Sequence, residues 1–470
     1  MGLVTPVDLL EVAELGAVHF IAIGGSGMSG VASALRQLGV EVSGSDRQDS
    51  TYLRALEAQG ARVYVGHAAA QLGDARTVVA SSAIRDDNPE LAEARRRGLR
   101  VLHRSAALGS VMLGRRGVAV AGTHGKTTTT AMIAHVLSGV GADPSYVIGG
   151  ALTGSSTGGH IGGGDVLVVE ADESDGSFLQ YPAEVAVVTN VDPDHLSTWG
   201  TAENYADGFV RFATGATVRL LVVSADDPGA VALTERVRGR GGERPSILTF
   251  GESASADVRI GDAAFAGTGS MFTLDGAPVR LGVPGHYNLW NAAAAYAVAV
   301  DLGADPAAVR AELGSYGGTN RRFQLVGTVD GIRVFDDYAH HPTEVANTLR
   351  AARTGVGQGR VVVCFQPHLY TRTRDFWREL AGALEQADVA VVMDVCGDRE
   401  DPIPGIDGAL VAEAVRPQTA EVIYQPDWDA AAPTVARLAR PGDLVITVGC
   451  GDVTKVAPLI VGALHRERGV

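Results

Sequence analysis

The sequence contains few cysteines and little positive charge. No two of its three cysteines, Cys364, Cys396 and Cys450, have the CxxC spacing of a redox or zinc motif. Because all three lie in or at the end of apolar runs, we expect reduced thiols in the core of a cytoplasmic protein. The net charge of −15 and the pI near 5.2 argue against a general nucleic-acid or membrane-surface binder. Local loops must therefore hold any anionic ligand.

A long uncharged apolar run is also missing. No stretch reaches the ~18 residues of a membrane helix, and Asp8, Glu11 and Glu14 interrupt the apolar N-terminal stretch. We therefore expect a chain that is neither exported nor anchored. A length of 470 residues with 46% hydrophobic residues predicts a large α/β protein of about three domains, at ~150 residues each.

Lysine is almost absent, since the chain carries only Lys126 and Lys455. Lys126 lies in the stretch from Gly117 to Thr130, where an apolar strand turns through glycines into a helical pattern of apolar residues. Such a loop surrounds a phosphate with backbone N–H groups and a lysine, and Thr127 at the helix N-terminus can bind Mg²⁺. The strict phosphate-loop pattern needs glycine where this chain has Val120. The alternative is a glycine-rich turn with a solvated lysine.

A second glycine-rich turn follows the expected strand from Val18 to Ile23. Its glycines have the spacing G-x-x-G-x-x-G from Gly24 to Gly30, which is close to the dinucleotide fingerprint, and Asp46 ends the next strand. The pattern predicts a diphosphate at a helix N-terminus and a contact from Asp46 to a nucleoside. Alternatively, the glycines only allow close strand–helix packing. Further strands at 62–65 and 77–80 complete a small parallel sheet.

Acidic residues follow two apolar strands of the central region. Glu170 ends the first, and a carboxylate beside a phosphate loop can hold Mg²⁺, although it can also be a turn or capping acid. Asp194 and His195 follow the second strand, where the imidazole can be a second metal ligand. The charge-free stretch 149–164 is too polar for a core, so we expect it to face the substrate.

The last third of the chain again alternates strands with helical spacers. Strand signals at 332–335, 360–365, 389–394, 421–424 and 443–448 predict another doubly wound unit. The stretch 366–374 brings arginines to its ligand edge, where a guanidinium suits a carboxylate. The predicted fold class is therefore α/β with three doubly wound units, namely a Rossmann-like domain at 1–114, a phosphate-loop domain at 115–318 and a Rossmann-like domain at 319–470.

Several of these motifs occur in one order along essentially the whole chain. They are the turn 24–30, Gly122–Thr127, Glu170–Asp175, Asp194-His195, Pro284-Gly285 with Asn288 and Asn291, and Asp337–Pro342. In this set and order the chain resembles the Mur ligase family, and within it the branch that adds L-alanine. The resemblance implies ATP-dependent ligation of L-alanine to the lactyl carboxylate of UDP-N-acetylmuramate through an acyl phosphate, in cytoplasmic peptidoglycan synthesis. It implies ATP and Mg²⁺ as cofactors, no nucleic-acid or membrane partner, and a monomer or weak dimer.

The resemblance also assigns roles to individual residues. The catalytic residues that it implies are Lys126, Glu170 and His195, and the metal ligands are Thr127, Glu170 and His195. The ATP-binding residues are Gly122, Thr123, His124, Gly125, Lys126, Thr127, Thr128, Asn288, Asn291, Arg322 and Asp337. The UDP-sugar-binding residues of the first domain are Gly24, Gly25, Ser26, Gly27, Met28, Ser29, Asp46, His67, Ser81, Ser82 and Arg104. The L-alanine-binding residues are Tyr338, His340 and Arg372.

Two positions depart from the family pattern. Tyr287 stands where members often have histidine, so a histidine–adenine contact cannot be transferred to it. Leu369 stands where some members have arginine, which leaves Arg372 as the expected ligand of the alanine carboxylate.

The lysine scarcity separates the branches of the family. Later-acting Mur ligases hold a second metal with a carbamylated lysine of the central domain, and this chain has no lysine between Lys126 and Lys455. This disfavours the ligases that add D-glutamate, diaminopimelate or lysine, or D-alanyl-D-alanine, and folylpolyglutamate synthase. The recycling ligase that attaches a whole tripeptide to the same nucleotide remains an alternative, although Tyr338 and Glu344 favour the alanine branch.

Two other classes of protein explain less of the sequence. A NAD-type Rossmann oxidoreductase would account for the turn 24–30 but not for the phosphate loop, Glu170 or His195. A non-catalytic UDP-sugar-binding regulator would not need the intact set of Lys126, Thr127, Glu170 and His195.

Overall fold

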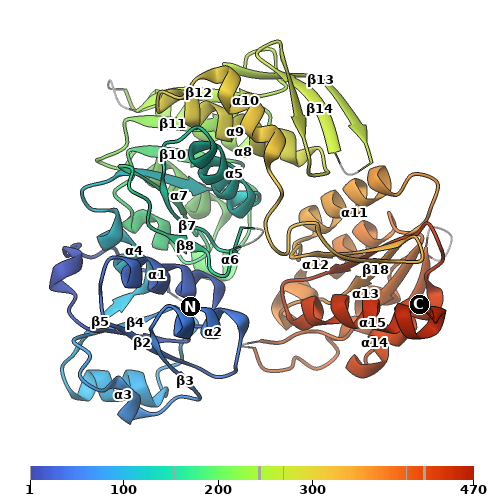
Figure 1. The fold of residues 1–470 in the computed structure, drawn as a ribbon, viewed down its shortest axis with the longest axis horizontal. Coiled ribbons are helices and arrows are strands. Elements are labelled where there is room, and N and C mark those ends of the chain that lie inside the picture. The colour runs from blue at the N-terminus through green and yellow to red at the C-terminus, as the bar shows by residue number, and fades with distance from the viewer. Residues whose placement is uncertain are drawn as a thin grey trace. The chain divides into compact units, whose positions relative to one another are not determined.

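The computed structural model describes residues 2–152, 155–241, 245–267, 269–398, 400–416 and 420–469. It forms two compact units. The first comprises Met1–Asp262, Thr273–Val279 and Trp290–Tyr316, and the second comprises Ala263–Phe272, Arg280–Leu289 and Gly317–Val470. Figure 1 follows the elements from the blue N-terminus to the red C-terminus.

A five-stranded parallel sheet opens the first unit, in the order β3-β2-β1-β4-β5. Its strands are β1 (Val18–Ile21), β2 (Val42–Asp46), β3 (Arg62–Val65), β4 (Thr77–Ala80) and β5 (Arg100–His103). Its helices are η1 (Val12–Glu14), α1 (Ser26–Gln37), α2 (Thr51–Ala58), η2 (Ala69–Leu72), α3 (Pro89–Arg96) and α4 (Arg104–Met112). The strand order reverses between β1 and β4, and ligands of such sheets bind at this point, outside the carboxyl ends of the strands.

The second sheet has ten strands, in the order β15-β14-β13-β12-β11-β10-β6-β9-β7-β8. The strands are β6 (Arg116–Ala121), β7 (Ser145–Val147), β8 (Gly159–His160), β9 (Val166–Glu170), β10 (Val185–Val188), β11 (Leu220–Ser224), β12 (Ser246–Gly251), β13 (Val258–Ala266), β14 (Gly269–Leu274) and β15 (Ala277–Leu281). The helices are α5 (Lys126–Gly139), η3 (Ser177–Gln180), α6 (Leu196–Trp199), α7 (Ala202–Ala213), α8 (Pro228–Gly239), α9 (Tyr287–Asp301) and α10 (Pro306–Ser315). Because β6 lies between β9 and β10, the loop after β6 lies beside Glu170, which ends β9, and Thr189, which follows β10.

The third sheet has six strands, in the order β16-β17-β21-β18-β19-β20. The strands are β16 (Gln324–Val329), β17 (Ile332–Asp337), β18 (Val361–Phe365), β19 (Val389–Val392), β20 (Glu421–Tyr424) and β21 (Leu444–Val448). The helices are α11 (Pro342–Val356), α12 (Tyr370–Leu384), α13 (Gly408–Ala412), α14 (Trp428–Leu438), η4 (Asp452–Lys455) and α15 (Val456–Arg468). The edge strand β16 runs antiparallel to β17, which the sequence pattern did not predict.

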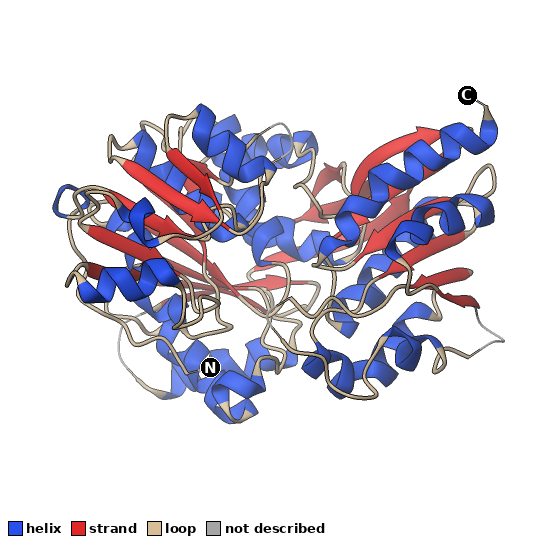
Figure 2. Cartoon of the chain, turned by 90° about the horizontal axis from the view of Figure 1, so that it is seen from below, coloured by secondary structure: helices blue, strands red, loops and turns tan. Residues whose placement is uncertain are grey.

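The third sheet is buried on both faces. Along β18, Val361, Val363 and Phe365 enter one core cluster, while Val362 and Cys364 enter another. Helices cover both faces of such a parallel sheet (Figure 2), which is why its strands read as continuous apolar runs. These sheets confirm the predicted α/β class with three doubly wound units.

Among the described residues, none of the helices combines the length and the apolar character that a membrane span requires.

Two expectations about which residues are buried need correction. Only Cys364 is a core thiol, because Cys396 and Cys450 are partly exposed. The stretch 149–164 is not wholly outside the core, because Thr157, Gly158 and Gly159 are buried. The carbonyl oxygen of Gly159 accepts a hydrogen bond from Ser33 Oγ of α1 at 3.1 Å, so this part packs against the first sheet's helix. Residues 153 and 154 of the stretch lie outside the described residues.

Candidate active site

Two glycines shape the loop between β6 and α5. Gly122 has a φ of 136° and Gly125 a φ of 83°, in a region of backbone conformation that favours glycine. A Cβ atom at Gly122 would also lie 2.0 Å from Thr189 Oγ1. The loop can therefore turn into the first turn of α5, whose unpaired N–H groups suit a phosphate.

Lys126 is the first residue of α5, and its ammonium turns back over the loop. Nζ donates hydrogen bonds to the carbonyl oxygens of Gly122, at 2.7 Å, and Thr123, at 3.1 Å. It also forms an ion pair with Glu173 Oε2 at 2.8 Å. Burial disfavours the charge, but the carboxylates of Glu173 and Asp172 outweigh it and raise the pKa of Lys126. The lysine therefore carries a full positive charge at the phosphate loop.

Glu173 is the main residue that sequence reasoning missed. Its side chain is 1% exposed, and Oε1 lies 3.8 Å from His195 Nε2. Burial raises the pKa of Glu173 to about 7, and Asp172 adds to this, against the opposing charge of Lys126. The carboxyl group therefore lies between the lysine of the phosphate loop and the expected metal-binding histidine. Its place in the acidic stretch after β9 was the only signal in the sequence.

Thr127 and Glu170 come together although they belong to different elements. Thr127 Oγ1 donates a hydrogen bond to Glu170 Oε1 at 3.0 Å, and the backbone N–H of Gly149 donates to Oε2 at 2.7 Å. Hydroxyl and carboxylate oxygens are the donors that Mg²⁺ prefers, so this pair fits a magnesium ion beside a bound phosphate. His195 has a left-handed backbone, with a φ of 54°, and its ring lies 3.5 Å from Asp194 Oδ2.

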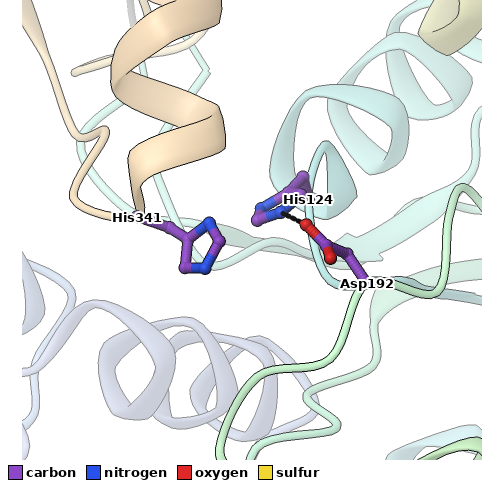
Figure 3. A group of neighbouring side chains, drawn as sticks. All are labelled: His124, Asp192 and His341. Carbon is purple, nitrogen blue, oxygen red and sulfur yellow. Dashed lines mark hydrogen bonds and ion pairs between the residues drawn. The ribbon is translucent and has the colours of Figure 1, made fainter. Parts of the chain in front are cut away.

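The segment after β10 holds the phosphate loop from the other side. His124 Nε2 lies 3.2 Å from Asp192 Oδ2 (Figure 3). The backbone N–H of His124 donates to Asn190 Oδ1 at 2.8 Å, and Thr123 Oγ1 donates to the carbonyl oxygen of Asp192 at 2.8 Å. These bonds join the ends of β6 and β10. Thr128 is buried in the first turn of α5.

The two expected adenine-side amides are buried in α9. Thr129 Oγ1 donates a hydrogen bond to Asn291 Oδ1 at 3.1 Å, which ties this amide to the helix of the phosphate loop. Asn288, which belongs to the second unit, donates from Nδ2 to the carbonyl oxygen of Pro284 at 2.6 Å.

The expected UDP-sugar residues lie at the carboxyl edge of the first sheet. The backbone N–H of Gly24 donates to Asp46 Oδ2 at 2.9 Å. His67 follows β3, Ser81 and Ser82 follow β4, and Arg104 follows β5. The glycine turn opens α1, with Gly25 as its N-cap and Ser26 and Gly27 in its first turn. The side chains of Met28 and Ser29 are buried in α1, so only their backbone is placed to face a ligand.

Arg104 joins this edge to the acidic stretch after β9. Its Nη2 lies 3.0 Å from Asp172 Oδ2, and a Cβ atom at Gly27 would lie 2.4 Å from its Nη1. Burial opposes both charges, but the pairing raises the pKa of Arg104 and lowers the pKa of Asp172. Ser82 Oγ donates a hydrogen bond to the Asp175 carboxylate. Within the first unit, the carboxyl edge of the first sheet therefore lies next to the acidic stretch beside the phosphate loop of the second sheet.

The expected alanine-binding residues gather in the second unit. The guanidinium carbons of Arg321 and Arg322 lie 4.7 Å and 4.9 Å from the centroid of the Tyr338 ring. His340 lies 3.4 Å from Glu344 Oε2. Burial lowers the pKa of His340 to about 3, and the nearby Arg372 adds to this against Glu344. His340 is therefore neutral at physiological pH.

Asp337, which we expect to contact the ATP ribose, is held by hydrogen bonds from backbone N–H groups. Its carboxylate accepts hydrogen bonds from the N–H groups of Phe323, at 2.7 Å, and Ala339, at 2.8 Å. Burial raises the pKa of Asp337 to about 6.

Comparison with known proteins covers nearly the whole chain. Residues 17–116 match the model of the Mur ligase family catalytic domain, 120–299 that of the Mur ligase middle domain, and 321–451 that of the Mur ligase glutamate ligase domain. The chain is 55% identical to a UDP-N-acetylmuramate–L-alanine ligase of Cutibacterium acnes, over 99% of each protein. It is 52% identical to the ligase of that name from Thermobifida fusca, over 99% of this chain and 100% of the relative. The crystal structure of a UDP-N-acetylmuramate–alanine ligase from Thermotoga maritima is similar, with a TM-score of 0.81, 28% identity and coverage of 96% of this chain and 99% of that one.

Proposed function

Because the chain belongs to the Mur ligase family, we propose that it joins L-alanine to the lactyl carboxylate of UDP-N-acetylmuramate, converting ATP to ADP and phosphate. The observation that carries this proposal is the arrangement of the first unit. There Arg104, at the expected nucleotide-sugar edge of the first sheet, pairs with Asp172. Lys126 of the phosphate loop pairs with the next residue, Glu173. The two expected binding regions therefore meet at one acidic stretch.

The reaction has two steps. An oxygen of the lactyl carboxylate attacks the γ-phosphorus of ATP, which forms an acyl phosphate and releases ADP. The amine of L-alanine, after losing its proton, then attacks the acyl carbon, and phosphate leaves as the amide forms. Phosphorylation is needed because it converts a poor leaving oxygen into a good one.

The first step places charge on the phosphoryl oxygens, and the loop residues stabilise it. Lys126 supplies a fixed positive charge, and the N–H groups at the start of α5 donate hydrogen bonds. Thr127 and Glu170 would hold a Mg²⁺ ion and His195 a second one. When bound, magnesium neutralises charge on the transferring phosphoryl group. Glu173 holds Lys126 at the loop through the 2.8 Å ion pair.

The second step needs L-alanine with its carboxylate bound and its amine free. Arg372 would bind the carboxylate with its planar guanidinium, with Tyr338 and His340 beside it. The neutral ring of His340 adds no second positive charge that would compete for the carboxylate. Among the predicted ATP residues, Asn291 would lie on the adenine side, and Arg322 and Asp337 would contact the nucleotide.

We further propose domain boundaries at 1–114, 115–318 and 319–470. The matched family ranges 17–116, 120–299 and 321–451 support a division into three parts. We also propose a cytoplasmic location and a monomer or weak dimer.

The test is phosphate release from ATP and Mg²⁺ with UDP-N-acetylmuramate, in the presence of L-alanine, glycine, L-serine or the murein tripeptide in turn. We expect release that depends on L-alanine. Dependence on the tripeptide alone would assign the chain to cell-wall recycling, and release independent of the nucleotide sugar would contradict the role of the first sheet.

A further inference from the structure

A closed network of polar side chains lies beneath the carboxyl edge of the first sheet. Its centre is Glu90 in the first turn of α3, whose side chain is 0% exposed. Glu90 Oε1 lies 3.3 Å from His19 Nε2, and Oε2 lies 2.5 Å from Ser45 Oγ and 3.1 Å from His67 Nδ1. Ser45 Oγ also lies 2.8 Å from His67 Nδ1, and Ser43 Oγ lies 2.9 Å from His19 Nδ1. Three neighbouring strands are thus joined to one buried carboxylate.

The hydrogen atoms of this network can be assigned. Burial opposes the charge on Glu90, but the hydrogen bonds from His19 and Ser45 outweigh it and lower the pKa of Glu90. An ionised carboxylate only accepts hydrogen bonds, so the single hydroxyl hydrogen of Ser45 points to Oε2 at 2.5 Å. The two oxygens that contact His67 Nδ1, Glu90 Oε2 and Ser45 Oγ, are then both acceptors. His67 Nδ1 therefore carries a hydrogen, which it donates toward Glu90 Oε2 and Ser45 Oγ.

This assignment determines what His67 offers to a ligand. In a neutral imidazole with its proton on Nδ1, Nε2 carries a lone pair and accepts a hydrogen bond. The His67 side chain is 20% exposed, whereas those of His19 and Glu90 are 0% exposed. The network thus buries the carboxylate and leaves the imidazole at the surface of the ligand edge.

His67 lies where a nucleotide base is expected. In this type of sheet the diphosphate sits at the N-terminus of the first helix and the ribose contacts the acid at the end of the second strand. Here these places are taken by the turn before α1 and by Asp46, whose carboxylate is 2.9 Å from the N–H of Gly24. The base extends beyond the ribose, toward β3, and His67 follows that strand.

We propose that His67 Nε2 accepts a hydrogen bond from the N3–H of uracil, and that Glu90 is the positioning residue that keeps the imidazole in the required tautomer. This rests on the proposed function for the presence of a uridine nucleotide. Uracil carries a hydrogen on N3, whereas the N3 of cytosine is an acceptor and would face the lone pair of Nε2. The Glu90–His67 pair therefore selects uridine over cytidine nucleotides.

The first measurement needs no change in the network. Protein with ¹⁵N-labelled histidine is studied by long-range ¹H–¹⁵N NMR, with His67→Asn to assign the His67 ring, and binding of UDP and of CDP is measured by calorimetry. We expect the proton on Nδ1 and a clear preference for UDP. A ring protonated on Nε2, or equal affinity for UDP and CDP, would overturn the inference.

The second measurement compares two substitutions of Glu90. In Glu90→Met the freed Ser45 hydroxyl donates to Nδ1 of His67, so the ring proton moves to Nε2. We then expect UDP to bind about tenfold more weakly, as for one lost hydrogen bond. The affinity for CDP should not decrease. Glu90→Gln is the matched control, because its amide oxygen can still face His67 while its NH₂ group faces His19, and it should keep the preference for UDP. Equal loss of both nucleotides in the Met variant, with the fold intact by circular dichroism, would contradict the proposal.

The two proposals fail in different ways. A chain that binds UDP-N-acetylmuramate but does not distinguish UDP from CDP would contradict only the role of His67 and Glu90. A chain that binds neither UDP-N-acetylmuramate nor UDP would refute the nucleotide-sugar assignment and this inference together.

Discussion

The ammonium of Lys126 lies 2.8 Å from Oε2 of Glu173, and the other oxygen of this carboxylate lies 3.8 Å from His195 Nε2. One buried acid therefore connects the charge of the phosphate loop with the expected second metal ligand.

Lys126→Ala should abolish phosphate release, with a loss in kcat on the order of 10³ or more, because the charge that stabilises the phosphoryl oxygens is removed. Binding of UDP-N-acetylmuramate, measured by calorimetry, should remain nearly intact. Lys455→Ala is the matched control, since this lysine is 60% exposed and forms an ion pair with Asp452, three residues earlier in η4. Unchanged turnover in the Lys126 variant would contradict the role given to this residue.

Thr127→Val should raise the Mg²⁺ concentration needed for half-maximal rate by roughly tenfold or more, because it removes the hydroxyl beside Glu170 at similar side-chain volume. Thr130→Val, in the same helix, is the control: its hydroxyl donates to the carbonyl oxygen of Lys126 at 2.8 Å. Initial rates across a magnesium titration give the comparison. An equal shift in both variants would point to a general disturbance of α5 instead of a lost ligand.

Arg104→Met should lower the free energy of unfolding by about 1–2 kcal/mol, because it leaves the Asp172 carboxylate without its partner in a partly buried place. Arg104→Met combined with Asp172→Asn should recover part of this loss. Urea unfolding of the wild type, both single variants and the double variant measures the coupling. Strictly additive losses would show that the 3.0 Å pair contributes no coupling energy.

Gly159→Ala should destabilise the first unit by about 1–3 kcal/mol, because the new Cβ atom overpacks a close backbone contact. That atom would lie 2.0 Å from the carbonyl oxygen of Gly30. Gly239→Ala, where no atom lies within 4 Å of the new Cβ, should instead stabilise α8 by up to about 1 kcal/mol. Thermal unfolding of the two variants tests the difference, and a neutral Gly159 variant would mean that the two backbones can separate without cost.

His340 should remain neutral well below pH 6, since burial lowers its pKa to about 3. The unfolded chain takes up this proton near pH 6.5, so the contribution of His340 to stability is present above that pH. It falls by up to about 1.4 kcal/mol per pH unit as the pH decreases toward 3. NMR titration of the His340 ring checks the pKa, and His340→Asn should flatten the decrease in urea midpoint between pH 6.5 and 5. A ring that titrates near pH 6.5 would contradict the burial argument.

The sequence by itself determined the class of fold and the phosphate loop. Apolar strand patterns that alternate with helical ones specify doubly wound sheets, and glycines before Lys126 specify a strand–loop–helix turn, because both depend on residues close in the chain. The rule that neighbouring strands end at one edge also placed Glu170 near Thr127, and the structure brings their oxygens to 3.0 Å.

Only the tertiary structure decided which of several nearby acids and histidines act together. The acidic stretch after β9 contains Asp172, Glu173 and Asp175, and no local pattern says that the first pairs with Arg104 and the second with Lys126. Glu90 gave no signal at all, because a glutamate in the first turn of a helix is ordinarily a solvated residue. Its burial against His19 and His67 depends on how three strands and α3 pack, and packing between distant segments is not encoded in the spacing of any one segment.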